Sequence, residues 1–245
     1  MILGVSHIVL ASTDLTRDRQ TLESIGWKTQ FEQRSIPTHP GKRPFMSTQS
    51  TEQGLIFMHP GQGTPVELIH YADELPDRSD SPMQIVLPQP QIHAPLGHLT
   101  CPLQFAATAP VPSLITHFVT DMDAASRFWQ KGLGFKRAAA QDGPPGSLQL
   151  EFRSLMPHWR ATLLLVSTKG PPAQPLLDGP GFRVLSIVST HLVNDRARLF
   201  EQGGAISATG TMTLRVDGKK LVLDLIEGPN GVMVELFETL QSGRK

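Results

Sequence analysis

The stretch Leu114-Ile-Thr-His-Phe-Val119, followed closely by Asp121-Met-Asp-Ala-Ala-Ser-Arg-Phe-Trp-Gln-Lys-Gly-Leu-Gly-Phe135, decides the fold. The first part alternates as a strand does, whereas the second places apolar residues at helical spacing, so the apolar period changes from 2 toward 3.6. Asp121 stands where a helix N-cap accepts hydrogen bonds from free backbone amides. Gly134 suits the left-handed conformation that often ends a helix. The stretch therefore predicts a strand, a helix and a return into further strands.

The same order of elements occurs near the N-terminus. Val5–Leu10 alternates as a strand, Asp14 takes the N-cap position, and Gly26 closes the helix. Three apolar residues are expected on the inner face of this helix: Leu15, Leu22 and Ile25. The segment ends in Val66-Glu67-Leu68, a predicted strand whose apolar residues are interrupted by one carboxylate.

A third copy of this order lies near the C-terminus. Val184–Val188 is the predicted strand, and Gly203-Gly204 closes the following helix, whose inner face is expected to carry Val193, Ala197 and Phe200. The copy ends in Pro229-Asn-Gly-Val-Met-Val-Glu235, a turn that leads into a strand with one carboxylate. Three such repeats predict an α+β fold of three βαβββ units, called units one, two and three in chain order.

Residues 73–112 separate units one and two and contain eight prolines. Proline cannot donate a backbone hydrogen bond, so this density predicts a linker without a central strand or a long helix. We expect three parts: a first βαβββ unit over 1–72, the proline-rich linker over 73–112, and paired units over 113–245 that form one domain.

The composition excludes several classes of partner. Lys plus Arg is 22 and Asp plus Glu is 22, so no basic excess favours nucleic acid or an anionic membrane. The single cysteine, Cys101, excludes an internal disulfide framework and a site of several thiolates. Apolar runs are too short for a membrane span, and the start lacks the basic and long apolar regions of a signal peptide. We therefore expect a cytoplasmic protein.

The helix that ends in Leu133-Gly-Phe135 and the closing strands at Glu67 and Glu235 resemble those of the vicinal-oxygen-chelate superfamily, which includes glyoxalases, bleomycin-resistance proteins and extradiol dioxygenases. This resemblance implies a glyoxalase-like fold, in which two βαβββ units pair into a curved, barrel-like sheet with the ligand on its concave side. We expect units two and three to form such a pair. Unit one is then a half-barrel with an open edge, and a second copy of the chain would cover it in a homodimer.

The resemblance also implies where a metal ion would bind. Members of the superfamily take a His or Gln from the first strand of a unit and a Glu from its last strand, and in unit one His7 and Glu67 fill these positions. Such ligands suit a divalent ion of Zn, Ni, Mn or Fe. Leu114 and Val184 stand at the first-strand positions of units two and three. We therefore expect neither a metal ion nor a dioxygenase site in that pair.

Three functions follow from these residues. The first is a metal-dependent lyase or isomerase of the glyoxalase type that acts on a substrate with vicinal oxygens, with Glu67 and Glu235 as catalytic carboxylates. The second is a metal-free binding protein like the antibiotic-sequestering members. The third is a metal-free enzyme in which Glu235 is an acid or base. A structural role for His7, on a strand face with apolar neighbours, is the alternative to a metal ligand.

Overall fold

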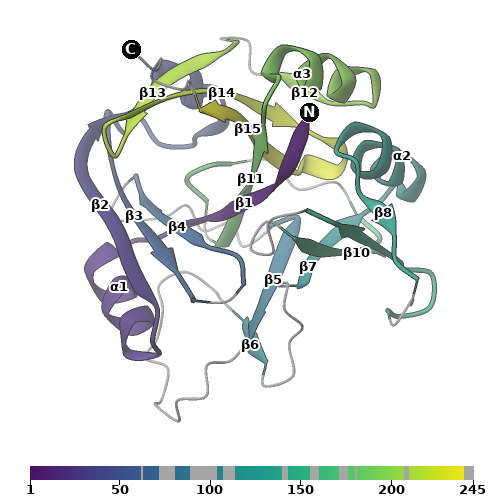
Figure 1. Cartoon of the computed structure of the whole chain (residues 1–245), viewed down its shortest axis with the longest axis horizontal. Coiled ribbons are helices and arrows are strands. Elements are labelled where there is room, and N and C mark those ends of the chain that lie inside the picture. The colour runs from purple at the N-terminus through teal and green to yellow at the C-terminus, as the bar shows by residue number, and fades with distance from the viewer. Residues whose placement is uncertain are drawn as a thin grey trace.

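The described residues of the computed structural model (Figure 1) form two β-sheets and three α-helices. The structure describes residues 1–61, 63–71, 81–88, 104–106, 114–139, 143–154, 160–170, 176–179, 181–206 and 210–239. The larger sheet, sheet A, has nine strands in the order β12-β14-β15-β11-β1-β4-β3-β2, with β13 paired to β14. The smaller, sheet B, has six strands in the order β6-β5-β7-β10-β9-β8.

The three units have the predicted order of elements. Unit one comprises β1 (Ile2–Ala11), α1 (Leu15–Ser24), β2 (Lys28–Pro37), the 3₁₀ helix η1 (Pro40–Phe45), β3 (Glu52–His59) and β4 (Val66–His70). Unit two comprises β7 (Leu114–Val119), α2 (Met122–Arg127), the π-helical turn η2 (Phe128–Gly132), β8 (Lys136–Arg137), β9 (Leu148–Phe152) and β10 (Ala161–Ser167). Unit three comprises β11 (Gly181–Ser189), α3 (Leu192–Glu201), β12 (Ala205–Ile206), β13 (Met212–Val216), β14 (Lys219–Glu227), the 3₁₀ turn η4 (Pro229–Gly231) and β15 (Met233–Thr239).

Local sequence signals placed the helix starts and the last turn correctly. The carboxylates of Asp14 and Asp121 accept hydrogen bonds from the backbone amides of Arg17 and Ala124, at 2.9 and 2.8 Å. Asn230 in the turn before β15 has a φ of 63°, a left-handed conformation that asparagine tolerates. Its side-chain oxygen accepts from the backbone amide of Thr120 at 2.7 Å, so the turn also holds the start of α2.

The pairing of the units differs from the prediction. Strand β1 pairs antiparallel with β11, so unit one joins unit three within the same chain, and the expected pair of units two and three is wrong. Unit two lies in sheet B instead, where β5 (Met83–Pro88) and β6 (Gln104–Ala106) extend it. Because β11 covers the edge of β1, unit one is not an open half-barrel. Homodimer formation stays a prediction, now without that argument.

The prediction that residues 73–112 exclude a central strand is also wrong. β5 pairs parallel with β6 and antiparallel with β7, so it lies inside sheet B. The prolines permit this because Met83–Leu87 contains none, and Pro88 stands at the end of the strand. Within residues 73–112, the structure describes 81–88 and 104–106, and the rest of the segment lies outside the described residues.

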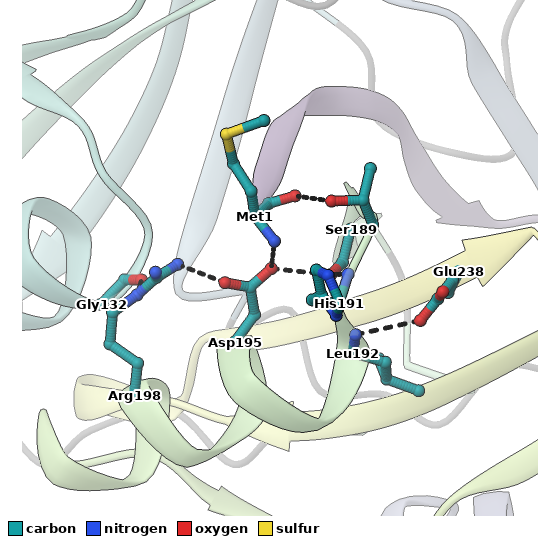
Figure 2. Close-up of polar contacts among 9 residues, drawn as sticks. Met1, Gly132, Ser189, His191, Leu192, Asp195, Arg198 and Glu238 are labelled. Atoms are coloured by element: carbon teal, nitrogen blue, oxygen red, sulfur yellow. Dashed lines mark hydrogen bonds and ion pairs between the residues drawn. The ribbon is translucent and has the colours of Figure 1, made fainter.

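The inner face of α3 differs from the predicted one. Val193 is 65% exposed and Phe200 37% exposed, whereas Leu192 and Leu199 are buried. The face is rotated toward Asp195, which is 1% exposed. Figure 2 shows the polar contacts that permit its burial: Asp195 lies 2.9 Å from the Met1 amine and 2.8 Å from Arg198, which also donates to the carbonyl of Gly132 in unit two. A hydrophobic pattern could not reveal this, because the buried face contains a paired carboxylate.

A continuous apolar core joins the two sheets. It includes Leu15 and Leu22 of α1 and Ile25 directly after it, as predicted, and the aromatic residues Phe128, Trp129 and Phe135 of unit two. In the described part of the chain, no helix is long and apolar enough to cross a membrane.

Candidate active site

His7 and Glu67 face each other from neighbouring strands of sheet A. Strands β1 and β4 are parallel and adjacent, which brings the Nε2 atom of His7 to 3.7 Å from an oxygen of Glu67. His7 is 7% exposed, and its Nδ1 lies 3.0 Å from the Ser6 hydroxyl. Its Nε2 is buried and has no hydrogen-bond partner among the described residues. Burial lowers the pKa of His7 to about 3, so the imidazole is neutral at ordinary pH.

Unit three adds a second carboxylate to the same place. Strands β11 and β15 are parallel, and the Ser186 hydroxyl donates to Glu235 at 2.8 Å. Ser186 also lies opposite His7 in the register of β1 and β11. Burial and the nearby Glu235 raise the pKa of Glu67 to about 7, against the opposing effect of Lys42. Burial also raises the pKa of Glu235, which Lys42 and the Ser186 hydrogen bond oppose. The site therefore disfavours the ionisation of both carboxyls, and Glu67 gains or loses its proton near neutral pH.

A buried lysine of η1 supplies the positive charge. Lys42 is 6% exposed, and its Nζ donates to the side-chain oxygen of Gln53 at 3.1 Å and to the Tyr71 hydroxyl at 3.4 Å. Nζ also lies 5.6 Å from the centroid of the Tyr71 ring. Burial works against its charge, but Tyr71, Glu67 and Glu235 outweigh burial and raise the pKa of Lys42. The ammonium therefore stays charged.

The segment before β11 fixes the position of this lysine. Asp178 is fully buried, and its carboxylate accepts hydrogen bonds from the backbone amides of Ser47 and Thr48, at 2.9 and 2.7 Å. The amide of Leu177 donates to the carbonyl of Phe45, the last residue of η1, at 2.7 Å. The segment before unit three therefore holds η1, and with it Lys42, in place.

A cavity of about 910 Å³ lies on sheet A. Its polar wall includes His7, Lys42, Gln53, Glu67 and Glu235. Its apolar wall includes Phe31 and Phe57, whose rings stack with centroids 5.3 Å apart, and Phe237 of β15. A cavity of this size, mostly apolar with a few convergent polar groups, is typical of a small-molecule site.

With the Lys42 ammonium beside them, the donor atoms of this site do not fit a divalent metal ion. Two equivalent buried Ser–Asp pairs align units one and three of sheet A. Ser12 donates to Asp18 and Ser189 donates to Asp195, so corresponding residues of the two units are 177 positions apart. The same shift makes Val184 the counterpart of His7 in unit three, and Val184 packs in an apolar cluster. Among the described residues, no three His, Cys, Asp or Glu side chains are grouped to hold an ion. The buried ammonium of Lys42 already supplies a positive charge, which opposes the binding of a cation beside it.

Comparison with known proteins agrees with this architecture. The family model "Glyoxalase/Bleomycin resistance protein/Dioxygenase superfamily" matches residues 113–236, just over half of the chain. The chain belongs to this superfamily. The predicted resemblance and the glyoxalase-like fold are thus confirmed.

Solved structures of glyoxalase I from Zea mays show the same fold as this superfamily member. One, wild type, has a TM-score of 0.62 at 15% identity, covering 96% of this chain and 92% of that chain. A mutant of the same enzyme has a TM-score of 0.63 at 15% identity, covering 96% and 93%. No curated protein matches the chain in sequence.

The superfamily pattern located part of the site. His7 and Glu67 lie together as predicted, and Glu235, which was assigned to another pair of units, joins them through the pairing of β1 with β11. Sequence reasoning missed Lys42, Gln53, Tyr71 and Ser186. Lys42 stands in Pro40-Gly-Lys-Arg-Pro44, which has the composition of an exposed turn and gives no sign of burial.

Proposed function

We propose that this superfamily member is a small-molecule enzyme, a lyase or isomerase that moves a proton on a carbonyl compound with vicinal oxygens. The observation that carries the proposal is the group of Glu67, Glu235 and Lys42 on the wall of the cavity, with Glu67 facing the neutral ring of His7. Catalytic acids and bases work best when their pKa lies near the operating pH, and that of Glu67 is raised to about 7.

The proton transfer follows from the charges on these groups. Ionised Glu67 takes a proton from the carbon next to the substrate carbonyl, and the electron pair of the broken C–H bond moves onto the carbonyl oxygen as an enolate. Protonated Glu67 then returns the proton to the former carbonyl carbon, and the proton of the neighbouring hydroxyl passes to the former carbonyl oxygen, which gives the isomer. Glu235, held by Ser186, keeps the second carboxyl next to Glu67 and raises its basicity. No step passes through a metal ion, because the donor atoms do not fit one.

A metal-free binding protein is the second candidate. The stacked rings of Phe31 and Phe57 and the ring of Phe237 form an aromatic wall that could hold a planar ligand without chemistry. In that case, Glu67 and Glu235 would bind polar groups of the ligand only.

Hydrogen exchange in D₂O separates the two candidates. Hydroxyacetone and pyruvate are incubated with the protein, and loss of the α-proton signal is followed by ¹H NMR. We expect wild type to catalyse exchange and Glu67→Gln to lower the rate by about 10²–10⁴-fold, the usual contribution of an acid–base group. Glu151→Gln, a carboxylate of sheet B that pairs with Arg153, is the matched control and should exchange as wild type does. Saturable binding of either probe without exchange by wild type would favour the binding protein instead.

A further inference from the structure

Lys42 is unusual because an ammonium is seldom buried unless opposite charges surround it. Here it lies on the wall of the cavity with only 6% of its surface exposed. Of its three protons, two are donated to Gln53 and Tyr71, which are its hydrogen-bond acceptors among the described residues. The third proton is available to a molecule in the cavity.

The two carboxyls of the site depend on this charge. Glu67 and Glu235 come from different units, and each raises the cost of ionising the other. Three other described nitrogen bases lie on the cavity wall. The ring of His7 is neutral, Lys219 is exposed at the start of β14, and His59 at the end of β3 accepts a hydrogen bond from the backbone amide of Gly61. Lys42 lies on the wall of the same cavity as both carboxyls and lowers the pKa of each.

The repeat explains why a cation is needed there. The first-strand position that corresponds to His7 holds Val184, so one nitrogen ligand of a metal site is missing, while both carboxylates remain. Two half-buried carboxylates in one cavity are costly to ionise without a counter-charge, and an ammonium on η1 can offset them without any bound ion.

We propose that the Lys42 ammonium takes the place of the divalent ion in this site, and that its free proton binds the substrate oxygen on which negative charge develops. The second half rests on the proposed function, in which Glu67 leaves an enolate oxygen. The substrate class that fits is a small carbonyl compound with a neighbouring oxygen, such as a 2-oxo acid or an α-hydroxy ketone. The carbonyl oxygen would lie at Nζ while the adjacent carbon faces Glu67.

Metal binding tests the first half independently of any activity. Wild type, Lys42→Met and Lys42→Arg, purified without a histidine tag, are analysed for metal content and titrated with ZnCl₂, MnCl₂ and NiCl₂ while the melting temperature is followed. We expect no stoichiometric metal and no rise in melting temperature for wild type and Lys42→Arg. Lys42→Met leaves the carboxylates without a cation, so its melting temperature should rise by several degrees with one of these ions. Lys136→Met, on the exposed edge of sheet B, is the matched control and should behave as wild type.

Two results would overturn this half. One is stoichiometric metal in wild type that His7→Ala removes. The other is a Lys42→Met variant that folds, by circular dichroism, and gains no metal-dependent rise. Where Lys42→Met does not fold, Lys42→Gln is used with the same expectations, because the glutamine amide can still bond to Tyr71.

The exchange assay tests the second half. With hydroxyacetone and pyruvate, we expect wild-type exchange to be unaffected by EDTA, and Lys42→Gln to lower the rate by more than about 10²-fold, as removal of an oxyanion donor does. Lys42→Arg should recover part of this loss, because it keeps the charge. Exchange that Glu67→Gln abolishes and Lys42→Gln leaves unchanged would refute the role of Lys42 and keep that of Glu67. Exchange that neither variant changes would refute both roles, while the metal titration would still decide the first half.

Discussion

His7 on β1 and His117 on β7 lie on the first strands of two βαβββ units, yet they have different surroundings. Both are buried, and burial lowers the pKa of each to about 3. His117 accepts a hydrogen bond from the indole of Trp129 at 3.0 Å and packs on the helical side of sheet B. His7 faces Glu67 and the ring of Phe57 on the cavity side of sheet A.

The difference comes from position along the strand and from the partner strands. Counted from the helix caps Asp14 and Asp121, His7 corresponds to Leu114, and His117 lies three residues further on. Three residues turn a side chain to the opposite face of a strand. In sheet A, Glu67 of β4 pairs with Val9 of β1. At the corresponding place in sheet B, Leu164 of β10 pairs with Thr116 of β7, so an apolar residue stands where sheet A has the carboxylate. The same fold thus carries a polar cavity in one sheet and an aromatic core in the other.

The largest loss of stability is expected when an aromatic side chain in the core of sheet B is truncated. Trp129 is fully buried and contacts Phe128, Phe135 and His117. Trp129→Ala should lower the free energy of unfolding by about 3–5 kcal/mol, measured by urea denaturation, because it leaves a large cavity. Exchange activity per folded molecule should stay near that of wild type. A strong loss of activity in folded Trp129→Ala would break the division of roles between the two sheets.

The next effect concerns Glu67 and the stability of the protein against pH. Its pKa rises from 4.5 to about 7 on folding, so the folded state binds its proton more tightly than the unfolded state. The stability that this group contributes is therefore present below about pH 4.5 and is lost as pH rises through about 7, on the order of 3 kcal/mol in all. Glu67→Gln should lose less stability than wild type between about pH 5 and 8. Parallel curves for the two proteins, from urea denaturation at each pH, would contradict the raised pKa.

His117 is expected to change the pH dependence of stability by a smaller amount and in the opposite direction. Its pKa falls from 6.5 to about 3 on folding, so its contribution to stability is present above about pH 6.5 and is lost as pH falls. At about pH 5 the loss is about 2 kcal/mol. His117→Phe should remove this loss, while at neutral pH the unpaired indole of Trp129 costs about 1–3 kcal/mol. His7→Phe should also reduce the loss of stability at acid pH. Unlike His117→Phe, it should change exchange activity as well. If the free energy of unfolding of both variants falls with acid as that of wild type does, neither histidine is buried in its neutral form.

Much of the fold was predictable because its signals are local. Asp14 and Asp121 cap helices, Asn230 forms a left-handed turn, and strands alternate, all within windows of a few residues. The order of these elements is that of the superfamily, which also identified His7, Glu67 and Glu235. The inner face of α3 was wrong because Asp195 is buried by contacts with residues distant in sequence, including Met1.

The sequence by itself determined the three βαβββ units and the carboxylates that close two of them, because each depends on short-range periodicity and turn residues. Only the tertiary structure decided that β1 pairs with β11, since strand pairing depends on the faces and edges that all units bury together, not on their order in the chain. The same holds for Lys42. Its burial depends on Asp178, Gln53 and Tyr71, which the fold brings to it, and on the two carboxylates that offset the cost of removing its charge from water.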